Sequence, residues 1–472
     1  MKLDTIIRGG RVVTAGETFR ADVGIRNGRI VAIAEGLARG ADPRTDIVDA
    51  RGCWVIPGGI DAHVHLDLGA GRFRTSDDFT SGTRAAACGG VTTVIDFAHA
   101  EPGQGLRQGL DTWHAKAAGR ACVDYAFHMA ITAWDRQHRE IKCIFEQGIP
   151  TFKQYMIYAE RGLRSDDAAI FAALETLRDL GGRLLVHAES ERILDMLIRR
   201  HHTRESMRRY GARLHARSRP SFVEAAAVER VIRWARATRG PAYIVHLSTA
   251  EGADLVAAAR RDGVNVLAET CAHYLALDDR VFARPDGHLY ATCPQVRKPA
   301  DQRRLWRGLR DGTLCAIATD TCTFTRKQKD TWRGDWTRIP MGMPGVETLL
   351  PLVYTLGVRR RRLTMNQLVE KCCTGPARVM GLYPQKGTLR VGSDADLAII
   401  HPTRTRTVDW RRLETNCDWN PYQGWKLAGF ARDTFCRGRR IVKDYTFVGE
   451  VGYGRFVPRT LERGVAGAAG RV

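Results

Sequence analysis

The chain has 472 residues, 44% of them hydrophobic and 26% charged, so it is too long for one small core and close in composition to an average globular protein. Charges interrupt the apolar residues at its start, and no apolar run is long enough to cross a bilayer, so we expect no signal peptide, no membrane partner and a cytoplasmic location. The net charge of +21 comes mostly from arginines spread along the chain, and the twelve scattered cysteines include no CxxC pair, which indicates reduced thiols.

Residues 1–57 have the pattern of short strands in a small β domain. Apolar residues alternate through TIIRGGRVVT, FRADVGIRNGRIVAIAEG and TDIVDARGCWVIPG. The Asn27-Gly28 pair between two alternating runs predicts a β-hairpin with a tight turn.

From residue 58 to residue 385, short apolar runs alternate with longer amphipathic segments. The clearest helices are predicted over residues 166–182 and 221–240, where apolar positions recur every three or four residues and glycines follow. Eight strand-like runs precede or separate such segments: GGIDAHVHL, TTVIDFA, DYAFHMAIT, TFKQYMIY, RLLVHAES, PAYIVHLS, VNVLAETCAHY and CAIATDT. This alternation predicts an α/β fold with a (β/α)8, TIM-like barrel. A doubly wound sheet is the alternative, but no glycine-rich dinucleotide motif follows the first strand.

Strand-like runs return over residues 386–455, in GTLRVGSDADLAIIHP and FARDTFCRGRRIVKD. Because strands flank the β/α region on both sides, we expect the two chain ends to build one small β-sandwich domain together. Residues 456–472, which end in GVAGAAGRV, are expected to form a flexible tail.

Side chains able to bind metals fall at the ends of the predicted barrel strands, where such barrels place their active sites. His63 and His65 lie two apart on the first strand and therefore face the same way. Strands four, five, six and eight carry four further candidates: Lys153, His187, His246 and Asp320. Four histidines, a lysine and an aspartate at one barrel mouth predict a metal site.

Each of these residues also has an ordinary structural interpretation. A single strand-end histidine such as His187 is more often a hydrogen-bonded core residue than a ligand. Lys153 alone fits a snorkelling side chain, and Asp320 alone fits a helix cap. Their common register at one barrel mouth favours the metal site.

The chain resembles cyclic amidohydrolases of the hydantoinase/dihydropyrimidinase type. The resemblance extends from the opening strands to about residue 455. It is carried by PGGIDAHVHLD, GTRAAACGGVTTVIDFA, TFKQYMIY, LLVHAES, YIVHLS, ETCAHYL, ATDTCTF, RGDWTRIP and WNPYQGWK.

The resemblance implies two metal ions per chain. The more buried ion is expected to bind His63, His65 and Asp320, and the second ion His187 and His246. The usual metal of the family is zinc, which suits imidazole and carboxylate ligands, with manganese, iron or nickel as alternatives.

Lys153 is expected, again from the resemblance, to be carboxylated by carbon dioxide and to bridge the two ions. A bare ammonium beside two dications is repelled, whereas a carbamate offers anionic oxygen ligands.

The resemblance also implies a mechanism. A metal-bridging hydroxide attacks a ring carbonyl, Asp320 takes the proton and passes it to the leaving ring nitrogen, and Tyr158 hydrogen-bonds the developing oxyanion. A 5-substituted hydantoin or a dihydropyrimidine thereby opens to an N-carbamoyl amino acid. Without the resemblance, Tyr158 would be interpreted as a buried strand tyrosine.

Asp67, directly after HVHL, bears on the choice of ring. Similar dihydroorotases carry an arginine there that binds the substrate carboxylate, and allantoinases an asparagine, whereas Asp67 resembles hydantoinases and dihydropyrimidinases. A carboxylate repels an anionic substrate, so we assign Asp67 to the substrate site and expect a neutral ring.

Four positions depart from the family pattern. Thr321 replaces the histidine of a Ser-Asp-His triplet, and His273 lies in ETCAHYL where ETCPQYL is commoner. Cys293 and Met341 stand where hydantoinases carry a serine and an asparagine that contact the ring mainly through backbone groups. We expect both to remain at the substrate site, and His273 to be a structural histidine near the barrel mouth.

Other functions remain as alternatives. An allantoinase- or dihydroorotase-like enzyme would use the same ligands, and a dihydropyrimidinase-related assembly protein would keep the fold without catalysis. Nucleic-acid binding is a weaker alternative, because the densest basic clusters, residues 198–220 and 358–362, lack interleaved aromatic residues. We therefore expect a small-molecule substrate and no nucleic-acid partner, and the resemblance implies a homo-oligomer, a tetramer or a dimer.

Overall fold

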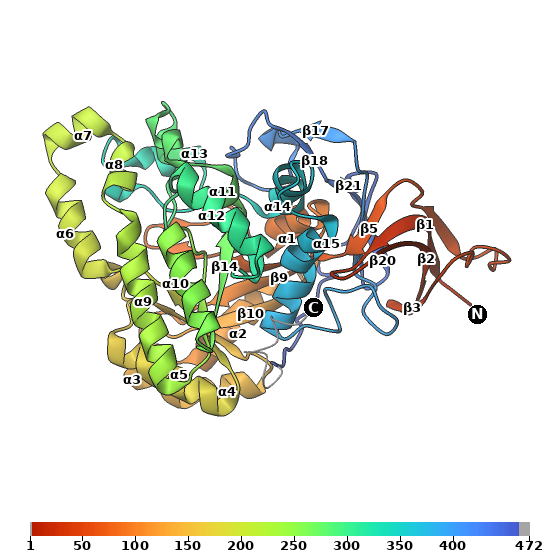
Figure 1. Ribbon diagram of the computed structural model, residues 1–472, viewed down its shortest axis with the longest axis horizontal. Helices are drawn as coiled ribbons and strands as arrows, with labels where there is room; N and C mark the ends of the chain where they lie inside the picture. Colours follow the sequence, from red (N-terminus) through yellow and green to blue (C-terminus); the bar gives the residue numbers. More distant parts are fainter. Residues whose placement is uncertain (1, 462–472) are drawn as a thin grey trace.

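The computed structural model describes residues 2–461, and its largest part is an eight-stranded parallel barrel with helices around it (Figure 1). The strands pair in chain order: β6 (Gly59–Val64), β9 (Val91–Ala98), β10 (Asp124–Ala130), β11 (Thr151–Tyr155), β12 (Arg183–His187), β13 (Ala242–Ile244), β14 (Val266–Cys271) and β15 (Ala316–Ala318). A parallel bridge between Val64 and Thr321 links the last strand to the first, so the barrel is nearly closed. Each strand overlaps one of the eight predicted runs.

Helices follow most of the barrel strands. In chain order they are α1 (Phe79–Cys88), α2 (Leu106–Ala117), α3 (Trp134–Gln137), α4 (Ile141–Glu146), α5 (Asp167–Leu180), α6 (Glu191–His201), α7 (Arg204–Tyr210), α8 (Arg213–Arg217), α9 (Ser221–Thr238), α10 (Ala250–Arg261), α11 (Ala272–Ala276), α12 (Pro299–Arg310), α13 (Arg326–Lys329), α14 (Leu349–Val353), α15 (Met365–Val369) and α16 (Gly375–Met380). The two helices predicted over residues 166–182 and 221–240 are α5 and α9. Asp166 caps α5 by accepting from the Ala169 N–H at 2.8 Å, and Gly181 ends it with a left-handed φ of 77°.

Strands from both ends of the chain form one nine-stranded sheet, which projects from the barrel in Figure 1. They are β1 (Thr5–Val13), β2 (Thr18–Arg26), β3 (Arg29–Ala34), β4 (Asp46–Asp49), β5 (Trp54–Pro57), β16 (Leu397–Ile400), β19 (Ala431–Cys436), β20 (Arg439–Lys443) and β21 (Thr446–Phe447). The predicted hairpin is confirmed, since Asn27 and Gly28 link β2 to β3 with φ of 50° and 74°. The predicted fold class, a (β/α)8 barrel with a small β domain from both chain ends, is confirmed.

A buried ion cluster joins the small sheet to the barrel. The Lys386 ammonium lies 2.7 Å from carboxylate oxygens of Asp124 and Asp396 and 3.2 Å from Asp394. Asp124 is the first residue of barrel strand β10, whereas Asp396 directly precedes β16 of the sheet. The cluster therefore fixes the sheet against the end of the barrel opposite its mouth.

The flexible tail predicted for residues 456–472 lies outside the described residues from position 462 onward. Residues 456–461 instead pack against the barrel. Phe456 forms a parallel bridge with Tyr125, and the buried Arg459 guanidinium donates to Thr151 Oγ1 at 2.7 Å. Phe456 and Arg459 thus contact barrel residues, which the composition of this short segment did not indicate. Between residues 2 and 461, no helix has both the length and the apolar character needed to span a bilayer.

Candidate active site

The six predicted metal ligands line one cavity of about 730 Å³ at the carboxyl ends of the barrel strands. They come from or directly follow strands β6, β11, β12, β13 and β15: His63, His65, Lys153, His187, His246 and Asp320. Because the strands are parallel and adjacent, residues 257 positions apart in the chain meet at one edge.

His63, His65 and Asp320 form the tightest group. Oδ1 of Asp320 lies 3.3 Å from Nε2 of His63 and 3.2 Å from Nε2 of His65. The three ligand atoms lie within 4.8 Å of one another. The other ring nitrogen of His63, Nδ1, lies 2.6 Å from the buried Glu269 carboxylate, which also accepts from the Tyr243 hydroxyl at 3.0 Å. This contact fixes the ring orientation and leaves Nε2 free to act as a ligand.

His187 and His246 form a second group beside the first. Their ring centroids are 4.5 Å apart, and the His246 ring is 5.3 Å from that of His63. Nε2 of His187 lies 2.9 Å from Glu189 Oε2. Since Glu189 occupies Nε2, the nitrogen of His187 that remains available to a metal is Nδ1.

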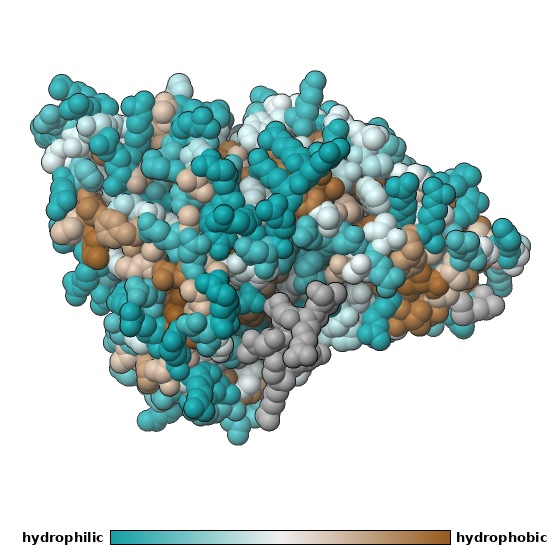
Figure 2. Space-filling view, viewed as in Figure 1, coloured by the Kyte–Doolittle hydropathy of each residue, from teal (hydrophilic) through white to brown (hydrophobic). Residues whose placement is uncertain are grey.

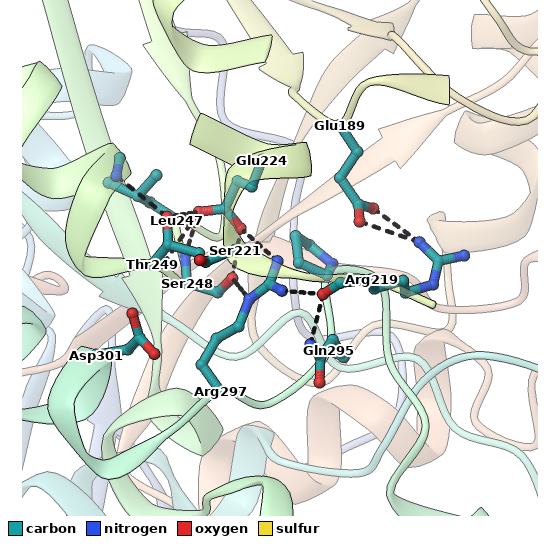
Figure 3. Close-up of polar contacts among 12 residues, drawn as sticks. Glu189, Arg219, Ser221, Glu224, Leu247, Ser248, Thr249, Gln295, Arg297 and Asp301 are labelled. Carbon is teal, nitrogen blue, oxygen red and sulfur yellow. Dashed lines mark hydrogen bonds and ion pairs between the residues drawn. The ribbon is translucent and has the colours of Figure 1, made fainter. Parts of the chain in front are cut away.

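Glu189 is itself held by Arg219, whose Nη1 lies 3.0 and 3.1 Å from the two carboxylate oxygens (Figure 3). Burial alone raises the pKa of Glu189, but Arg219 and His187 together lower it to about 2. Glu189 therefore stays ionised and keeps His187 in one orientation.

A polar network behind this pair ties the surrounding loops together (Figure 3). Gln295 Nε2 donates to the Arg219 carbonyl at 2.7 Å, and Arg297 Nε donates to Ser248 Oγ at 2.9 Å. Glu224, in α9, accepts from the backbone N–H groups of Ser248 and Thr249, each at 3.0 Å. Since Ser248 follows His246 by two residues, the network supports the loops that carry both histidines.

Lys153 lies in the floor of the cavity and is 1% exposed. Burial lowers the pKa of its ammonium to about 7, even though the charges of Asp320 and Glu269 oppose this change. A large fraction of the amine is therefore neutral near pH 7. A neutral amine is the form that reacts with carbon dioxide, so the environment suits the predicted carboxylation.

Three site residues have a left-handed backbone: Tyr158, His246 and Asp320, with φ of 72°, 40° and 51°. In residues other than glycine this conformation costs about 1–2 kcal/mol. Such positions cluster at functional sites, where the surrounding packing holds them. Each of the three follows a barrel strand by two or three residues, so the turn at the strand end places the side chain at the cavity.

Tyr158, Cys293 and Met341, predicted to contact substrate, also line the cavity. The Tyr158 ring centroid lies 5.5 Å from that of His187. Burial, and next the neighbouring Cys293, raise the pKa of Tyr158 well above its usual value. Its hydroxyl therefore keeps its proton and can act as a hydrogen-bond donor.

Asp67 is not part of the cavity wall. Arg74 Nε donates to Asp67 Oδ1 at 2.5 Å, and the side chain is almost fully buried in this pair. The Asp67 charge is matched by Arg74 and does not line the cavity, so it gives no reason to expect repulsion of an anionic substrate.

Two departures from the family pattern have structural partners. Thr321 Oγ1 lies 2.7 Å from Thr319 Oγ1, and Thr319 donates in turn to the buried Asp61 at 2.5 Å. His273, at the start of α11, is buried against the Tyr274 ring and does not line the cavity. Burial lowers the pKa of His273 to about 4, so it is a neutral packing residue.

Sequence reasoning missed three functional candidates. His99 follows β9, lines the cavity and has its Nε2 3.3 Å from the Tyr155 hydroxyl. The strand-end rule that identified the predicted ligands could also have identified His99. Glu189 lies two residues after a predicted ligand, but nothing in the sequence pairs it with Arg219. Arg161 lines the cavity and comes from the short helix Ala159–Arg161, which has no sequence signal.

The donor set of His63, His65 and Asp320 fits a divalent ion, and His187 and His246 lie beside it. Imidazole nitrogens and a carboxylate oxygen converge within ligand distance of a common centre, and the neighbouring carboxylates Glu269 and Glu189 orient two of the rings. Nδ1 of His246 has no hydrogen-bond partner among residues 2–461, although it is buried.

Comparison with known proteins agrees with this geometry. The D-hydantoinase of Geobacillus stearothermophilus is 38% identical over 463 residues, 96% of each chain. That of Streptomyces coelicolor is 37% identical over 465 residues, 97% of this chain and 98% of the other. The solved dihydropyrimidinase from Brevibacillus agri NCHU1002 covers 97% of this chain and 99% of its own, with a TM-score of 0.93 and 36% identity. Residues 54–440 match the amidohydrolase family, and the chain belongs to that family.

Proposed function

We propose that the protein hydrolyses the ring amide of a 5-substituted hydantoin or a dihydropyrimidine to an N-carbamoyl amino acid. The observation that carries this proposal is the convergence of six ligand residues and Tyr158 on one cavity. The names of the relatives, D-hydantoinase and dihydropyrimidinase, support this class of substrate.

The family implies a binuclear metal centre, and we propose zinc for both ions. His63, His65 and Asp320 would hold one ion, and His187 and His246 the other. Lys153, carboxylated, would bridge them; its burial and its pKa of about 7 support this role. When bound, the metals supply Lewis acidity and lower the pKa of a coordinated water.

Asp320 is the proton carrier of the reaction. Water adds its oxygen to the ring carbonyl carbon, and the Asp320 carboxylate takes the proton released. The same proton then passes to the ring nitrogen as the carbon–nitrogen bond breaks. The position of the Asp320 carboxylate, 3.3 Å from His63 and 3.2 Å from His65, supports this role.

Tyr158 donates a hydrogen bond to the carbonyl oxygen as negative charge develops on it. Its raised pKa supports this role, because a phenolate could not donate. Cys293 and Met341 are proposed to border the ring, and their backbone groups to hydrogen-bond its polar edge. Their position in the cavity wall supports this role.

A substrate panel tests the proposal: phenylhydantoin, dihydrouracil, allantoin and dihydroorotate with zinc-loaded protein. Hydantoin or dihydrouracil should be opened fastest, and in ¹⁸O-labelled water the new carboxylate should carry the label. Preference for allantoin or dihydroorotate would instead indicate an allantoinase-like or dihydroorotase-like enzyme. Failure to open any ring with two metals bound would favour a non-catalytic assembly protein.

We also propose that the protein forms a homo-oligomer, as a tetramer or a dimer. Ile193 and Met196 of α6 and Phe222 of α9 are 37–47% exposed, and Figure 2 shows apolar surface on this side of the molecule. Light scattering on the intact protein tests the assembly, and charged substitutions at Met196 and Phe222 should dissociate it.

A further inference from the structure

The outer wall of the cavity, beyond Tyr158, carries charged side chains that the proposed ring chemistry does not use. They are Glu101, Arg136, Glu160 and Arg161. They line the same cavity as the proposed metal ligands, within which a ring substituent must also fit. The charges there therefore bear on which substituent is accepted.

Arg161 is the charged residue of this wall that contacts the reaction site most directly. It ends the short helix η2 (Ala159–Arg161), which begins right after Tyr158. Its guanidinium carbon lies 5.1 Å from the centroid of the Tyr158 ring. That ring is the one whose centroid lies 5.5 Å from His187. One aromatic ring thus separates the Arg161 charge from a metal ligand.

The Arg161 charge also reaches a buried group of the cavity wall. Burial, and then His65, lower the pKa of His99 to about 3, and Arg161 adds to this effect. Glu101 acts instead on Lys116, which is not in the cavity wall. The guanidinium therefore acts on the cavity interior.

Arg161 has no carboxylate partner among residues 2–461. Arg164, three positions later, pairs with Glu191 at 2.7 Å, and Arg219 pairs with Glu189. A guanidinium that faces a substrate cavity without an internal counter-ion is a ready partner for an anionic ligand, since it offers two parallel N–H donors to a carboxylate. Asp67, which would have opposed an anion, is matched by Arg74 outside the cavity.

We propose that Arg161 selects ring substrates whose substituent carries an anionic group, such as a carboxylate on a short alkyl chain. The inference rests on the proposed function, because it assumes that the ring binds at the metal ligands. Arg161 binds the distal carboxylate and takes no part in opening the ring.

The test compares two substrates of equal size, 5-(carboxyethyl)hydantoin and 5-(carbamoylethyl)hydantoin, which differ only in charge at the end of the substituent. Metal-loaded wild-type protein should favour the carboxylate compound in kcat/KM by about tenfold or more, and added salt should reduce the ratio. Arg161→Met should bring the ratio close to one, with a larger loss of kcat/KM for the carboxylate compound than for the amide compound. Arg161→Glu should invert the ratio.

Arg139→Met is the matched control, because Arg139 is exposed and does not line the cavity. It should keep the wild-type ratio. Equal use of both compounds by wild-type protein, or a ratio that Arg161→Met leaves unchanged, overturns the inference while ring hydrolysis stands. If neither ring opens, the proposed function fails. Equilibrium binding of the ring-opened products N-carbamoylglutamate and N-carbamoylglutamine then tests the selectivity of Arg161 separately. Tighter binding of the former that depends on Arg161 supports the selectivity, and equal binding overturns it.

Discussion

Glu189 Oε2 lies 2.9 Å from Nε2 of His187, and both side chains are buried. This contact decides which nitrogen of His187 faces the cavity, because the carboxylate occupies the other one. Arg219 holds Glu189 in turn, so the orientation of a proposed metal ligand depends on a residue 32 positions away in the chain.

Arg219→Met should weaken the second metal site. Without its partner, the buried Glu189 carboxylate gains a proton more readily and no longer holds His187 firmly. We expect metal affinity at one of the two sites to fall about 10–100-fold, while the other site changes little. Metal content per chain and titration in chelator buffers measure this. Glu189→Gln, which keeps the size of the side chain, should give a similar but smaller loss. Arg213→Met, an exposed arginine of the same region, should have wild-type affinity; equal losses in both arginine variants would contradict the role of Arg219.

Lys153→Ala should remove the proposed bridge between the ions. Activity should fall by at least about 100-fold, and fewer than two metals should bind per chain, because both ions lose an anionic ligand. Acetate, a small carboxylate, should restore part of the activity and part of the metal binding. The exposed Lys142→Ala serves as control and should match wild type.

The carboxylation of Lys153 should also depend on pH. Burial lowers the pKa of this amine to about 7, so its nucleophilic neutral form declines as the pH falls below about 7. In metal-free protein with ¹³C-labelled bicarbonate, the carbamate signal in NMR should therefore decrease below this pH. A signal that stays constant from pH 6 to pH 8, or no signal at any pH, would count against the carbamate.

Tyr158→Phe should lower kcat by about 100-fold with little change in KM, since the lost donor acts on charge that develops in the transition state. Burial raises the pKa of Tyr158 well above its usual value, so wild-type kcat should show no decline from its ionisation up to pH 10. Tyr210→Phe, outside the cavity, is the matched control. A larger effect on KM than on kcat would assign Tyr158 to ground-state binding.

Much of the fold follows from local patterns in the sequence. The eight barrel strands are runs of buried residues, most of them apolar, and α5 and α9 carry regular apolar stripes. The convergence of the six proposed ligands could be predicted for the same reason, because each lies in the last three residues of such a strand or within two residues after it, and strand ends share one edge of a parallel barrel.

Contacts between loops could not be predicted in this way. The pairing of Arg219 with Glu189, and of Arg74 with Asp67, depends on loop conformations that no local periodicity encodes. Asp67 is the clearest case, since its position in the family pattern suggested a role at the substrate site, whereas it pairs with Arg74 and does not line the cavity. The packing of Arg459 on the barrel was missed because a short terminal segment gives no pattern of its own.

Lys329 offers a test of stability that is separate from catalysis. The side chain is fully buried in α13, and its ammonium donates to the Ala291 carbonyl at 3.1 Å. Burial lowers its pKa from 10.5 to about 7. Between these two pH values the unfolded chain holds the proton and the folded chain does not, so this residue makes stability rise with pH across the window.

Lys329→Met should therefore raise the free energy of unfolding at pH 7 and flatten its increase between pH 7 and pH 10. The gain should be no more than a few kcal/mol, because the Ala291 carbonyl loses its donor. Denaturant unfolding at several pH values measures this. The exposed neighbour Lys327→Met should leave the pH profile unchanged. If Lys329→Met lowers stability equally at all pH values, the lysine is held for its hydrogen bond, and its charge does not control the pH dependence.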